Sequence, residues 1–263
     1  MTVKLYHANI STCSQKVRLA LAEKGVEYES AVLNLRAGDQ YQPDYRKLNP
    51  NAVVPTLVNG DDVIIESTVI NEYIDDAFDG PALRPASPGQ RAAMRCWTKQ
   101  LDEGIHAAIV ILSFCIAFRN DFRGRTDEEM AAFYARMNNP VKEKFYREAL
   151  ARGIEHEGFT GAVNRFRKLL ADMDIALDGR NWLAGEHYSL ADIGLVPYLL
   201  RLEHLGLAGM WTELPGVTAW YDRVRQRPSY HTAVVDWLVP AAVSGMQEAG
   251  KPAWPRVREI LAS

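Results

Sequence analysis

The sequence is poor in cysteine and has no excess of basic residues. Its three cysteines, Cys13, Cys96 and Cys115, are odd in number and lack the paired spacing of a zinc site or a disulfide framework. We therefore expect a reducing, cytoplasmic environment and no metal. The chain has 30 Lys and Arg against 33 Asp and Glu, a formal net charge of −3. A protein that neutralises many phosphates needs a basic excess or stripe, so we expect no nucleic-acid partner.

Long hydrophobic runs are also missing. The most apolar stretch, residues 107–118, falls short of the ~20 residues that span a bilayer, so we expect no membrane segment. The N-terminus has no basic region followed by an apolar one, so no secretory signal is expected either. The hydrophobic fraction of 48% and the charged fraction of 24% are typical of a globular chain with a real core.

Helix-breaking residues gather near residue 85, in the run Gly-Pro-Ala-Leu-Arg-Pro-Ala-Ser-Pro-Gly that begins at Gly80. We predict a first domain over residues 1–80, a linker over 81–89 and a second domain over 90–263. The two parts differ in charge, because residues 1–84 hold 8 basic and 12 acidic residues, a net −4, and the remainder carries +1.

Hydrophobic periodicity predicts different structure in the two domains. In the first, short β-rich runs alternate with helical patterns, which indicates an α/β layer. The predicted strands cover residues 3–6, 28–33, 56–58 and 63–65, with helices over 16–23 and 68–78 and a short helix before the third strand. Gly25 predicts the end of the first helix, and Asn59-Gly60-Asp61 predicts a hairpin turn. After the linker a 3.6-residue period dominates, so the second domain is predicted to be all-helical.

Ser189-Leu190-Ala191-Asp192 fits a capping box at a helix start. The Ser189 hydroxyl is predicted to accept from the Asp192 N–H, and the Asp192 carboxylate to reach back. Capping accounts for both residues, so Asp192 is not counted as catalytic.

The segment from Asn9 to Lys16 leaves a strand and enters a helix with hydroxyl and thiol side chains in a row. Free N–H groups and the positive end of a helix dipole at such a junction favour an anion. The alternative is that Ser11 or Ser14 only caps the helix. Two further features do not indicate a binding site when each is taken alone. They are Pro55 immediately before a strand, and Glu66-Ser67 at the start of a helix.

Together these features resemble the glutathione transferase family across residues 3–78, and Trp182-Leu183-Ala184-Gly185 extends the likeness into the helical domain. The resemblance implies an N-terminal thioredoxin-like α/β domain that binds glutathione as cosubstrate, an all-α C-terminal domain, and a homodimer.

The resemblance also implies roles for single residues. Ser11 or Ser14 would activate the glutathione thiol, and this choice stays open. Val54 and a cis-Pro55 would pair with the cysteinyl backbone, and Glu66 and Ser67 would hold the γ-glutamyl end. Gln40 would meet the glycyl carboxylate, and Asp102 would reach across the dimer towards the glutathione amino group. The chain departs from the family in having Val53 where many members carry Gln or Lys, and no cysteine at position 11.

A serine is chemically sufficient for this activation. Lowering a thiol pKa from about 8.5 by ~2 units needs about 2.7 kcal/mol of preference for the thiolate. A hydrogen bond to a charged acceptor supplies ~1.5–3 kcal/mol, and a helix N-terminus adds ~0.3–1 kcal/mol. Cys13 is more simply explained as a small buried hydrophobe than as a reactive thiol.

The run from Leu83 to Glu103, and a long polar insertion at residues 120–157, resemble the bacterial transferases that cleave lignin β-aryl ethers. That resemblance implies displacement of a phenolate from the carbon next to a ketone. The candidate pocket residues for such a small aromatic electrophile are His106, Ile109, Phe114, Phe118 and Tyr134, with Phe145 and Tyr146 beside them. Plain core packing is the alternative for this aromatic stripe.

Two other functions stay open. The chain could conjugate glutathione to other small electrophiles with a different pocket. It could also be a non-catalytic binding or scaffold protein that keeps the fold, although the retained Ser11, Ser14, Pro55, Glu66 and Ser67 count against this.

Overall fold

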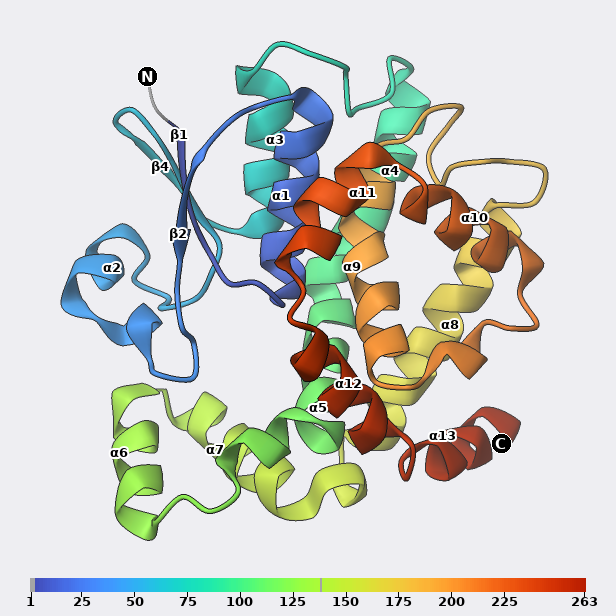
Figure 1. Cartoon of the computed structure of the whole chain (residues 1–263). Coiled ribbons are helices and arrows are strands. Elements are labelled where there is room, and N and C mark those ends of the chain that lie inside the picture. The colour runs from blue at the N-terminus through green and yellow to red at the C-terminus, as the bar shows by residue number, and fades with distance from the viewer. Residues whose placement is uncertain (1–2, 138) are drawn as a thin grey trace. The chain divides into compact units, whose positions relative to one another are not determined.

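The computed structural model describes residues 3–137 and 139–263 (Figure 1). The chain begins with alternating strands and helices, as predicted. In chain order these elements are β1 (Val3–His7), α1 (Thr12–Lys24), β2 (Glu29–Val32), the 3₁₀ turn η1 (Asp39–Tyr41), α2 (Pro43–Leu48), β3 (Thr56–Asn59), β4 (Asp62–Ile64) and α3 (Ser67–Ala77).

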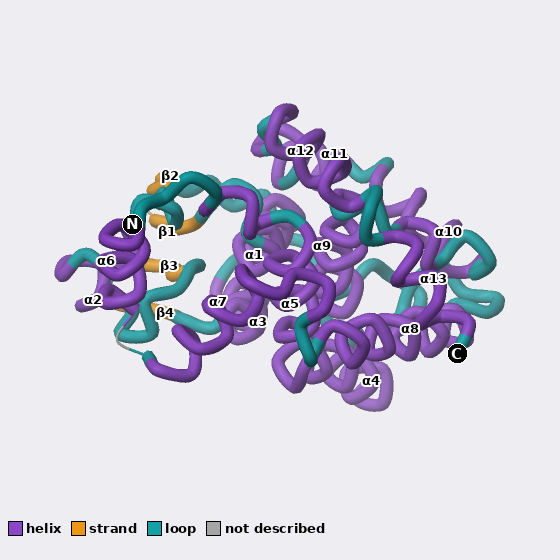
Figure 2. The backbone as a smooth tube through the Cα atoms, turned by 90° about the horizontal axis from the view of Figure 1, so that it is seen from below, coloured by secondary structure: helices purple, strands orange, loops and turns teal. Residues whose placement is uncertain are grey.

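The four strands form one mixed sheet in the order β2-β1-β3-β4, which Figure 2 shows in orange. β1 runs parallel to β2 and antiparallel to β3, and β3 runs antiparallel to β4. Leu5 pairs with Leu57 at the centre, and both side chains are fully buried. Helices α1 and α3 lie on one face of the sheet and α2 lies on the other (Figure 1).

From residue 88 onward the described residues form helices joined by turns and loops, with an isolated bridge between Trp182 and Gly185, so the prediction of a helical second part is confirmed. The α-helices are α4 (Pro88–Gln100), α5 (His106–Ile116), α6 (Asp127–Met137), α7 (Pro140–Arg152), α8 (Phe159–Ala176), α9 (Leu190–His204), α10 (Pro215–Arg225), α11 (Pro228–Ala233), α12 (Pro240–Gly250) and α13 (Trp254–Ala262). Shorter turns are the π-helical η2 (Leu101–Ile105) and the 3₁₀ turns η3 (Phe118–Phe122), η4 (Gly153–Glu155), η5 (Ala208–Met210) and η6 (Val235–Trp237).

The chain divides into two compact units, each assembled from three separate segments. The first unit comprises residues 1–99, 179–197 and 219–238, and the second comprises residues 100–178, 198–218 and 239–263. These units interleave along the chain, whereas the predicted domains follow one another. The predicted boundary at residues 81–89 therefore stays a prediction.

Local sequence signals explain the ends of α1 and the hairpin. Ser11 is the N-cap of α1, with its hydroxyl accepting from the Ser14 N–H. Gly25 closes the helix in the left-handed conformation (φ 68°) and donates its N–H to the Ala22 carbonyl. Gly60, also at positive φ, turns the chain between β3 and β4 as predicted.

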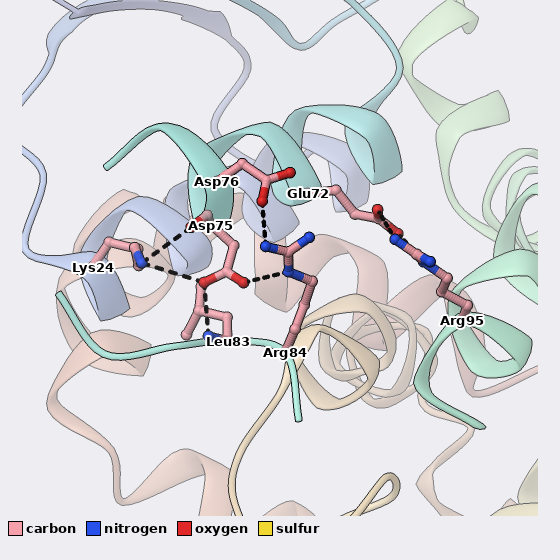
Figure 3. Close-up of polar contacts among 7 residues, drawn as sticks. All are labelled: Lys24, Glu72, Asp75, Asp76, Leu83, Arg84 and Arg95. Carbon is pink, nitrogen blue, oxygen red and sulfur yellow. Dashed lines mark hydrogen bonds and ion pairs between the residues drawn. The ribbon is translucent and has the colours of Figure 1, made fainter. Parts of the chain in front are cut away.

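Carboxylates at the end of α3 hold the predicted linker (Figure 3). Asp75, whose side chain is 3% exposed, accepts from the Leu83 N–H at 2.8 Å and from Arg84 Nε at 2.7 Å. It also pairs with the buried Lys24 ammonium of α1 at 3.3 Å, and Arg84 makes a second ion pair with Asp76. This linker is thus fixed to the first unit by charged hydrogen bonds, which are stronger than neutral ones.

The capping box before α9 forms with one difference. The Asp192 carboxylate accepts from the Ser189 N–H at 2.9 Å, as predicted. The Ser189 hydroxyl accepts from the Ala191 N–H instead of the Asp192 N–H. The same carboxylate accepts from the Leu183 N–H and from Trp220 Nε1 at 2.8 Å. Asp192 is wholly buried and all its hydrogen bonds are structural, in agreement with the assignment from sequence.

The described residues include no helix that is both long enough and apolar enough to cross a bilayer. All three cysteines are free thiols. Burial raises the pKa of Cys115 to about 12, so this thiol stays protonated at neutral pH.

Candidate functional site

The sheet topology gathers the predicted glutathione residues of the first unit at one end. The loop with Ser11 follows β1, and the loop with Gln40 follows the parallel strand β2. Because β3 is antiparallel to β1, the segment that precedes β3, with Val54 and Pro55, meets the same end. Glu66 follows β4, which runs antiparallel to β3, and so also lies there. Residues far apart in sequence are thus brought to one edge.

Ser11 and Ser14 occupy different environments in the loop before α1. Ser14 is fully buried, and its hydroxyl accepts from the Ala8 N–H at 3.2 Å. Ser11 is half-buried at the N-cap, where its hydroxyl oxygen accepts from the Ser14 N–H at 3.3 Å. A hydroxyl carries one proton to donate and two lone pairs. Both hydroxyls therefore keep a proton to donate, and Ser11 is the more accessible of the two because Ser14 is fully buried. Which of them meets the thiol stays a prediction.

The segment before β3 is held by a polar network. The Val53 carbonyl accepts from the Tyr45 hydroxyl at 2.5 Å and from Asn49 Nδ2 at 3.0 Å. Asn49 Nδ2 also donates to the Thr56 hydroxyl at 3.1 Å. The Thr56 hydroxyl in turn donates to the Tyr45 hydroxyl at 2.9 Å, because the Tyr45 proton is given to Val53. Thr56 and Asn49 are fully buried. These bonds fix the backbone on both sides of Val54 and Pro55, and sequence reasoning did not anticipate them.

The Val54–Pro55 peptide bond is cis, as the resemblance implied. Within the described residues, the Val54 N–H and C=O take no part in the hydrogen bonds of the sheet or the turn. An edge of backbone that is left open in this way can pair with an extended peptide. Val53, the residue that departs from the family pattern, is 41% exposed.

Glu66 has an unusual backbone at the start of α3. Its φ is 66° and ψ is 108°, a region that side-chain-bearing residues rarely occupy. Its side chain makes no capping bond to α3, so the first turn of this helix is open to an anion, and that turn contains no acidic residue. Asn51 Nδ2 donates to the Glu66 carboxylate at 3.3 Å. Ser67 is buried at the first position of the helix.

A carboxylate beside an open helix N-terminus suits a zwitterion, since Glu66 can hold an ammonium while the α3 N–H groups hold a carboxylate. Gln40 is 7% exposed, and its amide nitrogen donates to the Leu35 carbonyl at 3.4 Å. Its amide oxygen is buried and has no hydrogen-bond partner among the residues that the structure describes. A ligand group that donates a hydrogen bond would satisfy this oxygen.

Two residues that sequence reasoning missed lie beneath this edge, His7 and Arg18, and both are fully buried. Burial and the nearby positive charge of Arg18 lower the pKa of His7 to about 4, so the imidazole is neutral. Arg18 can only donate, so His7 Nδ1 accepts from it at 3.0 Å, and His7 Nε2 donates to the Ser30 hydroxyl at 2.7 Å. For Arg18 the available signal was its i,i+4 spacing from Ser14, which places the two polar residues on one face of α1.

The remaining predicted residues lie in the second unit. Asp102 is exposed on the π-helical turn η2, next to Gly104, whose φ of 146° marks a kink. Its predicted contact with glutathione stays a prediction. His106 is half-buried at the start of α5, with its Nδ1 3.4 Å from the Tyr198 hydroxyl. Ile109 is 2% exposed and is part of the core.

The predicted pocket aromatics pack mainly against each other. Phe114 lies 5.3 Å from Phe118, 5.9 Å from Phe145 and 4.4 Å from Tyr146, between ring centroids. Tyr134 is 7% exposed, and the Arg147 guanidinium lies 3.9 Å from its ring centroid. We call Phe114, Phe118, Phe122, Phe133, Tyr134, Phe145 and Tyr146 the aromatic cluster. Phe114 and Tyr134 are buried in this cluster, and their contact with a substrate stays a prediction.

Comparisons with known proteins show to which family the sequence and the fold are similar. The model of the glutathione S-transferase N-terminal domain matches residues 10–77, and that of the C-terminal domain matches residues 156–228. Protein LigF from Sphingobium is 32% identical over 87% of this chain and 91% of its own. The crystal structure of the β-etherase LigF superposes with a TM-score of 0.81 at 30% identity, covering 89% of this chain and 98% of that one. A tetrachloro-p-hydroquinone reductive dehalogenase from Sphingobium chlorophenolicum is also 32% identical, over 89% of this chain and 96% of its own.

Proposed function

Because the chain belongs to the glutathione S-transferase family, we propose that it uses the glutathione thiolate to cleave aryl ethers. The proposed substrate is an aromatic ketone with an aryl ether on the adjacent carbon, of the kind derived from lignin. The observation that carries this proposal is the likeness to the β-etherase LigF over almost the whole of both chains.

The geometry of the first unit supports glutathione as the cosubstrate. Glutathione has an ammonium and a carboxylate at its γ-glutamyl end, and Glu66 with the N-terminus of α3 matches this pair of charges. Its cysteinyl part is an extended peptide, which suits the open backbone of Val54 beside Pro55. The Ser11 hydroxyl at the N-terminus of α1 would then donate to the thiolate.

The proposed reaction is a displacement at carbon. The thiolate sulfur forms a bond to the carbon next to the ketone, and the bond from that carbon to the ether oxygen breaks. The thiol gives its proton to the solvent when the thiolate forms, and the phenolate leaves with the electron pair and takes a proton from the solvent. One glutathione and one ether thus give one thioether and one phenol. The Ser11 hydrogen bond raises the fraction of thiolate by favouring the anion, and Ser11 does not need to ionise.

A second candidate is transfer of glutathione to another aromatic electrophile. The similarity to the tetrachloro-p-hydroquinone reductive dehalogenase, equal in identity to that with LigF, favours a halogenated ring in this role. The same residues of the first unit would serve, and only the contacts with the electrophile would differ.

The test is to incubate the full chain with glutathione and a β-aryl ether ketone whose leaving group is 4-nitrophenol. We expect yellow phenolate and, by mass spectrometry, one glutathione thioether for each phenol released. No phenol, but conjugation of a simple aryl halide, would establish the second candidate. Failure to bind glutathione by calorimetry would leave a non-catalytic binding or scaffold protein.

We further propose that the protein acts as a homodimer in the cytoplasm, with Asp102 of one protomer near the glutathione of the other. The free state of the three cysteines supports a reducing compartment. Light scattering of the purified chain should give twice its mass of 29.5 kDa. Asp102→Ala should then raise the KM for glutathione with no change in that mass.

A further inference from the structure

The guanidinium of Arg18 makes all its described hydrogen bonds with neutral acceptors. Nε donates to the Ala233 carbonyl at 2.7 Å, and Nη2 donates to the Asn9 carbonyl at 2.9 Å. Nη1 donates to the Ala8 carbonyl at 3.3 Å and to His7 Nδ1 at 3.0 Å. The whole side chain is buried. A planar fork held at so many points has a fixed position.

These bonds fix the backbone that presents Ser11. The Ala8 carbonyl, bound by Arg18, also accepts from the Ser11 N–H at 3.2 Å. The Ala8 N–H in turn donates to the Ser14 hydroxyl at 3.2 Å. The loop of residues 8–14, which we call the serine loop, is therefore held from its two sides by side chains of α1.

Arg18 also has no anionic partner within the described residues. Among residues 3–137 and 139–263, no carboxylate lies within 4.0 Å of its guanidinium. The titratable groups that face it are His7 of β1 and Tyr28 after α1, both neutral, because burial lowers the pKa of His7 and raises that of Tyr28. The guanidinium itself stays charged at neutral pH, since burial lowers its pKa only to about 10.

The segment that follows α11 covers this charge. The ring of Trp237 lies over the guanidinium at 5.0 Å, and its centroid is 4.7 Å from that of His7. Helices α1 and α11 pack side by side (Figure 1). An aromatic face stabilises a cation without neutralising it, and it excludes water that would screen the charge.

We propose that Arg18 is a positioning residue for the glutathione thiolate: its buried fork fixes the serine loop, and its unneutralised charge favours the anion bound there. This rests on the proposed function. A buried charge without a counter-ion is costly, so its presence beneath a binding edge calls for an anion that compensates it. The charge also supplies what composition does not, because residues 1–84 carry a net −4.

The experiment compares two arginines that both join α1 to the chain near α11. Arg18 is changed to Leu, which removes the charge, or to Lys, which keeps a charge but loses the fork. The matched control is Arg227→Lys, because Arg227 binds Glu23 of α1 at 2.6 and 2.7 Å and does not touch the serine loop. The pKa of glutathione bound to the full chain is read from the ultraviolet absorbance of the thiolate against pH.

We expect Arg18→Leu to raise the pKa of the bound thiol by about one unit, a tenfold loss of thiolate at neutral pH. The kcat should fall by a similar factor and recover at higher pH, and the KM for glutathione should rise several-fold, because Leu also lacks the fork that holds the serine loop. Arg18→Lys should leave the pKa of the bound thiol close to that in the unmodified protein. It should raise the KM for glutathione several-fold, because the serine loop loses its fixed geometry. Arg227→Lys should leave the pKa of the thiol unchanged.

An unchanged thiol pKa in a folded Arg18→Leu variant would overturn the inference, with the proposed function intact. Absence of glutathione binding by the unmodified chain would instead overturn the proposed function. If Arg18→Leu does not fold, Trp237→Ala decides, because it admits water to the guanidinium. It should raise the thiol pKa by about half a unit, and no shift would refute the role of the charge.

Discussion

The serine loop and the aromatic cluster are held in place by different physics. In the serine loop, the Ala8 N–H donates to the Ser14 hydroxyl, and the Ala8 and Asn9 carbonyls accept from Arg18. In the aromatic cluster, rings such as Phe114 and Tyr146 meet in tilted and edge-to-face contacts, with no hydrogen bond between them. The first arrangement is directional, and the second is set by volume and shape.

The difference shows which region tolerates change. A polar network loses function when one group is removed, because the partner is left buried and unsatisfied. A ring cluster loses stability in proportion to the volume removed and accepts other apolar residues of similar size. We therefore expect the polar residues around the serine loop to tolerate few substitutions. Related enzymes can differ more readily in the aromatic cluster.

The largest effect on stability should come from the aromatic cluster. Phe114→Ala should lower the free energy of unfolding by about 3–5 kcal/mol, because Phe114 is 6% exposed and contacts three rings. Phe114→Leu should cost much less. Urea unfolding measures the loss, and calorimetry should show glutathione affinity unchanged in both variants. A loss below about 1 kcal/mol for the Ala variant would mean that this cluster is not a packed core.

The serine loop should be acid-sensitive through His7. The folded protein has a pKa for His7 of about 4, below the ordinary 6.5, so the unfolded chain binds more protons between these two values. Stability should therefore be complete above pH 6.5 and fall by about 3 kcal/mol as the pH drops to 4. His7→Gln should remove this part of the pH dependence. Equal acid sensitivity in both proteins would show that His7 is not the cause.

Substitutions of Ser11 and Ser14 should distinguish activation of the thiol from support of the serine loop. Ser11→Ala should reduce kcat/KM by roughly 10- to 100-fold and raise the pKa of the bound thiol, because about 1.5–3 kcal/mol of hydrogen bonding to the anion is lost. Ser14→Ala should lower the free energy of unfolding by about 1–2 kcal/mol, since the buried Ala8 N–H loses its acceptor, and should change the thiol pKa less. The reverse pattern would assign the catalytic role to Ser14.

The smallest effect should appear at Glu66. Glu66→Gly should raise stability by about 1 kcal/mol, because glycine adopts the positive φ without strain. Glu66→Ala should not be stabilised in this way, and both variants should bind glutathione more weakly. Ala52→Gly, at the other positive-φ position of a residue with a side chain, is the control that relieves strain without removing a charge. Thermal melts and calorimetry test all three.

The strands, helices and hairpin of the first unit could be anticipated because their signals are local. Gly25, the Asn59-Gly60-Asp61 turn and the hydroxyls before α1 each specify a backbone conformation within a few residues. Pro55 and Glu66 have only weak local signals, and their predicted roles come from the family resemblance. The sequence leaves open the choice between Ser11 and Ser14, because the fully buried state of Ser14 depends on the tertiary packing. Which hydroxyl meets the thiol stays a prediction.

The supporting residues could not be anticipated, because their partners are distant in sequence. Tyr45 and Asn49 bind the Val53 carbonyl only after the segment before β3 has folded against them. Arg18 is covered only after Trp237 has packed on it. The aromatic stripe was recognised, but periodicity cannot distinguish a ring that lines a pocket from one that fills a core. Burial of Phe114 and Tyr134 came from the structure alone.

The hydrogen bond from Arg18 to Ala233 also determines the earliest stage of synthesis at which the serine loop can have all its contacts. Its two ends are 215 residues apart. At about 5–20 residues per second, a ribosome needs roughly 10–40 s to make the intervening chain. Every strand of the sheet is finished long before then. Throughout that interval Arg18 lacks its contacts with Ala233 and Trp237, so the strands of the sheet are present well before the serine loop has all its supports.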